Sequence, residues 1–152
     1  MVIPEKNATV VLCIDDCASL LESLDLFLQD LGYTVRTASS GARGLELLLL
    51  QPVDLVIVDY QMPGMNGCEV AQAMRTLGLR TPIILFSGME PMPADCLNLV
   101  DVFIPKAQPT TWTSVEYWVQ HLTEEVPCEA PSREAAMEPN SGRLCENPTL
   151  GR

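Results

Sequence analysis

The sequence of 152 residues predicts an α/β fold in which a doubly wound sheet of five parallel strands carries helices on both faces. Five short apolar runs alternate along the chain with segments in which apolar residues recur at helical spacing. Such alternation with short connections is typical of parallel strands joined by right-handed crossovers. The runs are almost uninterrupted by polar residues, as expected for strands that are buried on both sides.

The strands are recognised by their apolar residues and by the turn residues that follow them. The clearest is 55–58, because four consecutive apolar residues lead into Asp59 and then into a loop that contains proline and glycine. The segment 33–38 is indicated by its β-branched and aromatic residues instead. The five expected strands are residues 9–15, 33–38, 55–58, 82–86 and 101–105.

The helices are indicated by their ends and by one apolar side. Ser39 or Ser40 is expected to cap the second helix, and Asn66 with Glu69 has the spacing of a capping box for the third. Residues 89–99 contain two prolines, so we expect a shortened fourth helix. The residues expected to face the core are Leu20, Leu24, Phe27, Leu28 and Leu31, then Leu45, Leu48 and Leu49, then Val70, Met74 and Leu77, and finally Trp112, Val115, Val119 and Leu122.

Composition and charge exclude several kinds of partner. The net charge is −11 and lysine and arginine form no cluster, which argues against direct binding to nucleic acid or to an acidic membrane surface. No apolar run approaches the ~18 residues of a membrane span, and the N-terminus lacks the features of a signal peptide. We therefore expect a cytoplasmic protein. Residues 8–122 should form one domain, and residues 123–152, rich in proline and glutamate, a flexible acidic tail.

Polar side chains stand at or just after the carboxyl ends of four of the strands. They are Asp15, Asp16, Asp59, Ser87 and Lys106. Because the carboxyl ends of parallel strands meet at one edge of the sheet, we expect these side chains to converge there. Three carboxylates in one pocket repel each other and favour a hard divalent cation such as Mg²⁺, whereas a lysine and a hydroxyl complement phosphoryl oxygens. The combination predicts phosphoryl transfer to a carboxylate nucleophile.

The stretch Asp59-Tyr60-Gln61-Met62-Pro63-Gly64-Met65-Asn66-Gly67 resembles the phosphoacceptor loop of response regulator receiver domains. The resemblance covers residues 8–122 and implies a flavodoxin-like (βα)5 fold with strand order 2-1-3-4-5. It implies that a sensor histidine kinase or a histidine phosphotransfer protein phosphorylates Asp59. Such a module is a phosphoacceptor that acts on an unnamed downstream protein, and not an enzyme beyond its own phosphorylation and dephosphorylation.

The resemblance also assigns a role to each residue of the predicted pocket. Ser87 would supply the switch hydroxyl, Lys106 would contact the phosphate and Phe103 would be the switch aromatic. The implied cofactor is Mg²⁺, or Mn²⁺ in its place. Its ligands would be Asp16, Asp59 and the main-chain carbonyl of Gln61, with Asp15 acting mainly through water.

Two other functions stay open, and one of them follows from a departure from the family. The family usually has Lys-Pro after the fifth strand, whereas this chain has Pro105-Lys106-Ala107, and a Lys-Ala bond strongly prefers to be trans. This departure leaves the direction of the Lys106 side chain open, and a pseudo-receiver that binds partners without phosphorylation is the first alternative. The second is a phosphatase with an aspartyl nucleophile, but Gln61 stands where those enzymes have a second aspartate.

Overall fold

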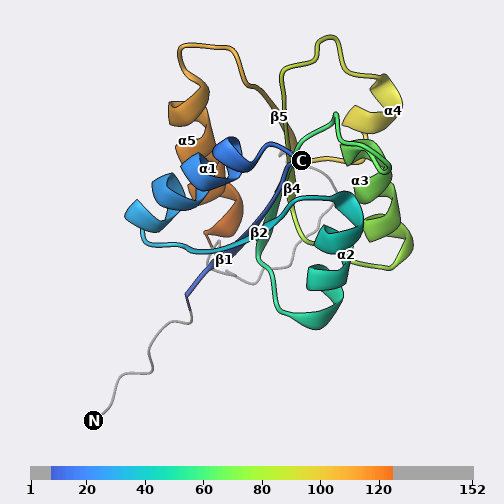
Figure 1. Cartoon of the computed structure of the whole chain (residues 1–152), viewed down its shortest axis with the longest axis horizontal. Helices are drawn as coiled ribbons and strands as arrows, with labels where there is room; N and C mark the ends of the chain where they lie inside the picture. Colours follow the sequence, from blue (N-terminus) through green and yellow to red (C-terminus); the bar gives the residue numbers. More distant parts are fainter. Residues whose placement is uncertain (1–7, 125–152) are drawn as a thin grey trace, which may run out of the picture.

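The computed structural model describes residues 8–124, which form a five-stranded parallel sheet with strand order β2-β1-β3-β4-β5 (Figure 1). Both the predicted fold class and the predicted strand order are confirmed. Most of the predicted tail, residues 125–152, lies outside the described residues. The strands are β1 (Val10–Ile14), β2 (Thr34–Ala38), β3 (Leu55–Val58), β4 (Ile83–Ser87) and β5 (Val102–Pro105).

Five helices cover the two faces of the sheet, with α1 and α5 on one face and α2, α3 and α4 on the other (Figure 1). The fourth helix has only four residues, as its prolines predict. Within residues 8–124, no helix has the length and apolar character needed to span a bilayer. The helices are α1 (Ala18–Asp30), α2 (Gly41–Leu50), α3 (Gly67–Thr76), α4 (Ala94–Leu97) and α5 (Thr111–Thr123).

The apolar strands divide the core into two layers because successive side chains point to opposite faces of the sheet. All four residues of β3 are buried. Leu55 and Ile57 pack in the layer under α1 and α5, whereas Val56 and Val58 pack in the layer under α2, α3 and α4. The central strands therefore have no solvent-facing side, which is why their sequences show no polar alternation.

The predicted helix ends are confirmed. Ser40 caps α2 by accepting a hydrogen bond from the Arg43 amide. Asn66 and Glu69 form a reciprocal capping box at the start of α3, with donor–acceptor distances of 2.8 and 2.9 Å. Each cap satisfies main-chain amides that have no partner inside the helix.

Four of the predicted core-facing residues are wrong. The exposed fractions are 37% for Leu31, 62% for Leu49, 53% for Leu77 and 38% for Trp112, whereas Leu21 and Leu47 are buried in their respective helices. Leu31 and Leu77 are the C-cap residues of α1 and α3, so the chain leaves the helix where they stand. Leu49 belongs to a run of four leucines, in which hydrophobicity alone gives no contrast between the two sides of a helix.

Gly67 brings the first turn of α3 against the main chain at the end of β3. Its amide donates a hydrogen bond to the Tyr60 carbonyl at 2.9 Å. A Cβ atom on Gly67 would lie 2.4 Å from the carbonyl oxygen of Asp59 and 3.0 Å from its carbonyl carbon. Because both are main-chain atoms next to a buried strand, the contact cannot be relieved by rotating a side chain.

We predict that Gly67→Ala lowers the free energy of unfolding by about 1–3 kcal/mol, the usual cost of forcing a group into a packed site. Urea denaturation monitored by circular dichroism measures this. Gly88→Ala is the matched control, because a Cβ there would have no heavy atom within 4 Å. Equal urea midpoints for the two variants would contradict the steric argument.

Candidate functional site

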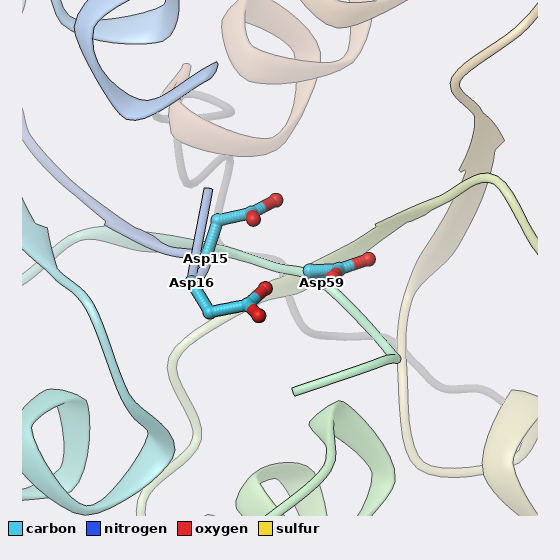
Figure 2. A group of neighbouring side chains, drawn as sticks. All are labelled: Asp15, Asp16 and Asp59. Carbon is cyan, nitrogen blue, oxygen red and sulfur yellow. The ribbon is translucent and has the colours of Figure 1, made fainter. Parts of the chain in front are cut away.

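Three carboxylates gather at the carboxyl end of the sheet, as the strand order predicts. Asp15 and Asp16 directly follow β1, and Asp59 directly follows β3, the strand next to it (Figure 2). One oxygen from each carboxylate lies within 4.8 Å of those of the other two. Asp15 and Asp59 are only 2% and 6% exposed, whereas Asp16 faces solvent.

The main chain holds the two buried carboxylates in place. The Asp59 amide donates to the Ile14 carbonyl at 2.9 Å, and the Asp15 amide donates to the Ala38 carbonyl at 3.1 Å. The Asp15 side chain also accepts a hydrogen bond of 2.8 Å from the Cys17 amide at the start of α1. The main-chain hydrogen bonds between the strands therefore continue up to Asp15 and Asp59. The sheet holds both residues in fixed positions.

Lys106 links the two buried carboxylates. Its Nζ lies 2.9 Å from Oδ2 of Asp15 and 3.2 Å from Oδ1 of Asp59. The lysine follows β5, and its amide donates to the Ser87 carbonyl at the end of β4, at 2.9 Å. The ammonium also lies 5.6 Å from the centre of the Phe86 ring. One positive charge thus faces two buried negative charges.

Burial and charge move two pKa values in this cluster. Burial raises the pKa of Asp59 above its usual range; Lys106 opposes this shift, while the charge of Asp15 adds to it. Burial alone would lower the pKa of Lys106, but its hydrogen bond with Asp15 and the charges of both aspartates outweigh burial and raise it. The lysine is therefore firmly protonated, and Asp59 gains from any further positive charge brought to it.

The carboxylates fit a small hard cation. Asp15, Asp16 and Asp59 offer oxygen donors of the kind that Mg²⁺ prefers, and the exposed side of the cluster leaves room for coordinated water. Repulsion among three carboxylates that face one lysine is reduced when such an ion binds. Gln61 lies in the exposed part of the loop after Asp59, and its carbonyl stays a predicted ligand.

The two predicted switch residues lie on neighbouring strands. Ser87 ends β4 and is fully buried, and its hydroxyl oxygen accepts a hydrogen bond of 3.2 Å from the Met89 amide. Phe103 is half-buried on β5, pairs in register with Leu85 and packs against the layer under α2, α3 and α4. The roles of Ser87 and Phe103 stay predictions.

One buried polar residue of this region was missed by sequence reasoning. Trp112 is the first residue that was expected to face the core from the last helix, whereas α5 begins at Thr111, whose hydroxyl is buried against the carbonyls of Pro105 and Lys106. A pair of threonines directly before an amphipathic segment is a sign of a helix start, and this was the available signal.

Within residues 8–124 the cis peptide bond is Glu90–Pro91, so Lys106–Ala107 is trans.

Sequence comparison finds relatives that share this part of the chain. The cell cycle response regulator CtrA of Brucella ovis is 34% identical over 79 residues, which are 52% of this chain and 34% of that protein. CtrA of Brucella abortus matches to the same extent. The shared region thus spans about a third of the curated relatives.

Structural comparison finds the same fold in several solved receiver domains. The response regulator TrrA of Thermotoga maritima, solved in complex with Mg²⁺ and BeF, has a TM-score of 0.69 and 30% identity over 75% of this chain and 98% of that one. The chemotaxis protein CheY4 of Vibrio cholerae has a TM-score of 0.68 and 27% identity over 76% and 98%. The sequence profile of the response regulator receiver domain matches residues 11–107, well over half of the chain. The chain therefore belongs to the response regulator receiver domain family.

Proposed function

We propose that this receiver domain is phosphorylated on Asp59 by a sensor histidine kinase or a histidine phosphotransfer protein, in a reaction that depends on Mg²⁺. The observation that carries the proposal is the environment of Asp59. Its carboxylate lies 3.2 Å from the Lys106 ammonium and shares a cluster with Asp15 and Asp16. Phosphorylation would switch a protein-interaction surface in cytoplasmic signalling. The folded unit would be residues 8–122, with 123–152 as a tail.

In the proposed reaction, a carboxylate oxygen of Asp59 attacks the phosphorus of the donor phosphohistidine. A new P–O bond forms while the P–N bond breaks, and the donor imidazole keeps the electron pair. The product is an acyl phosphate on Asp59. Asp15, Asp16 and Asp59 would hold Mg²⁺, which would supply positive charge for the transferring phosphoryl oxygens, and Lys106 would supply a second positive charge. The nucleophile must be deprotonated, which the lysine favours.

The geometry at Ser87 supports the proposed switch. A hydroxyl has one proton to donate and two lone pairs to accept with. Because the Ser87 oxygen accepts from the Met89 amide, its proton remains available for a phosphoryl oxygen. Movement of Ser87 toward the phosphoryl group would favour one of two existing arrangements of the β4–α4 loop and of Phe103.

The structure supplies arguments against both alternatives. The first alternative, a pseudo-receiver, rests on Pro105-Lys106-Ala107 in place of the family's Lys-Pro. In the structure Lys106 nevertheless contacts both buried carboxylates. A phosphatase of the aspartyl type needs an acid two residues after the nucleophile to protonate the leaving group, and the uncharged amide of Gln61 cannot act as that acid at neutral pH. The active phosphoacceptor is therefore the better supported function.

Incubation with acetyl phosphate and Mg²⁺ is predicted to add one phosphoryl group to the wild-type protein, seen by intact-mass spectrometry. Asp59→Asn should take up none, because the amide is not a nucleophile, and removal of Mg²⁺ with a chelator should abolish the reaction. Asp95→Asn, which neutralises an exposed carboxylate on α4, is the control and should react like the wild type. An adduct that persists on Asp59→Asn would place the reaction elsewhere.

Mg²⁺ is predicted to stabilise the folded protein through the three carboxylates. At a hundred times its dissociation constant, the ion should raise the free energy of unfolding by about 2.7 kcal/mol, measured by thermal denaturation. Asp16→Asn should reduce this gain strongly, whereas Glu116→Gln on the exposed side of α5 should preserve it.

The same stabilisation should depend on pH, since protons compete with the metal for Asp59. The raised pKa of Asp59 means that the proton begins to compete at a higher pH than at an ordinary aspartate. The gain from Mg²⁺ should therefore be complete at neutral pH and decrease as the pH falls through the carboxyl range. A gain that is independent of pH, or equal in Asp16→Asn, would rule out this metal site.

A further inference from the structure

The Thr111 hydroxyl lies at the centre of the loop that connects Lys106 to α5. Its oxygen is 2.8 Å from the Pro105 carbonyl, 3.1 Å from the Lys106 carbonyl and 2.8 Å from the Gln108 carbonyl. It also accepts a hydrogen bond of 3.1 Å from the Gln108 amide. The residue is only 3% exposed. The hydroxyl has one proton, which the three nearby carbonyl oxygens share, so the loop is packed closely around this residue.

These contacts differ from those of a helix cap. An N-cap side chain accepts from amides of the first helical turn, and the N-cap position of α5 belongs to Thr110, whose side chain makes no such bond. Thr111 is the first residue inside the helix, and its hydroxyl faces backward onto residues 105–108. Its hydrogen bonds therefore order the loop that precedes α5 and not the first turn of α5.

The loop that Thr111 orders determines where Lys106 points. On one side, the Lys106 amide donates to the Ser87 carbonyl and fixes the lysine to β4. On the other side, the carbonyls of Pro105 and Lys106 both lie against the Thr111 hydroxyl. The peptide unit before the lysine is thus held by its amide bond to Ser87, and the carbonyls of both neighbouring units share the Thr111 proton. Together these contacts set the direction in which the lysine side chain leaves the main chain. The ammonium then reaches Asp15 and Asp59 at 2.9 and 3.2 Å.

We propose that Thr111 is a positioning residue for the phosphoryl-transfer reaction, because its hydroxyl clamps the main chain on both sides of Lys106. The inference rests on the proposed function, since a positioning role presupposes phosphoryl transfer to Asp59. Thr111 does not touch the reacting atoms. It acts through Lys106, whose ammonium must be positioned accurately, because a small displacement weakens its contact with the phosphoryl oxygens.

The test compares phosphorylation rates with acetyl phosphate and Mg²⁺ in the full-length chain. Thr111→Val keeps the shape of the side chain and removes the hydroxyl, and it should slow the reaction about tenfold through misplacement of the lysine. Thr111→Ser keeps the hydroxyl and should restore the rate to within about twofold of wild type. Affinity for Mg²⁺ should not fall in either variant, because the carboxylates stay in place and a displaced lysine competes less with the ion for them.

A double-mutant cycle separates positioning from a general loss of structure. In the background of Lys106→Ala, the change Thr111→Val should alter the phosphorylation rate by less than about twofold, since this background has no ammonium for Thr111 to position. An equal slowing with and without the lysine, or a loss of Mg²⁺ affinity that parallels the loss of rate, would overturn the proposal. A wild-type phosphorylation rate in folded Thr111→Val would also overturn the proposal.

A replacement variant covers a failure of Thr111→Val to fold, and the wild-type chain tests the proposed function separately. Should Thr111→Val show no cooperative unfolding transition, Thr111→Ala takes its place in the same cycle, because a smaller side chain leaves space for water at the carbonyls. Failure of the proposed function looks different, since the wild-type chain itself would then accept no phosphoryl group on Asp59. Wild-type phosphorylation with no effect of Thr111 would refute the clamp alone.

Discussion

The charge contact of Lys106 with Asp15 and Asp59 is the interaction on which the rest of the site depends. Two buried carboxylates and one exposed carboxylate would not share a pocket without compensation, because like charges in a poorly hydrated site repel strongly. The lysine offsets this repulsion only in part, which leaves a net negative site open to a cation. The remaining negative charge favours a cation at this edge of the sheet, in line with the proposed Mg²⁺ site.

The parallel sheet meets this constraint by bringing distant parts of the chain to one edge. β1 and β3 are neighbours in the sheet although α1, β2 and α2 separate them in sequence, and β5 reaches the same edge through β4. Main-chain hydrogen bonds continue past the last strand residues to Asp15, Asp59 and Lys106. The charged groups are therefore attached to the sheet, whose strands are buried. Burial of the apolar layers under the helices offsets the free-energy cost of holding these charges close together.

Much of this architecture was predictable from the sequence, and the exceptions share a physical cause. Strand ends and caps are local signals, so the positions of Asp59, Ser40 and Asn66 followed from neighbouring residues alone. The orientation of Leu49 depends on which side of a uniformly apolar helix meets the sheet, and local hydrophobicity does not contain that information. Thr111 was missed for a related reason, because its role arises from carbonyls that only the folded loop brings to it.

The shortened fourth helix changes how a signal would leave the site. α4 has four residues, and Cys96 is its buried member, so few contacts anchor it to the sheet. Ser87 is connected to the segment before α4 through the Met89 amide, and a small movement of Ser87 would carry this loop with it. An element with little buried apolar surface is displaced at low free-energy cost. The proposed switch therefore requires only the modest energy of a few phosphoryl hydrogen bonds, and it acts on the least firmly packed helix of the domain.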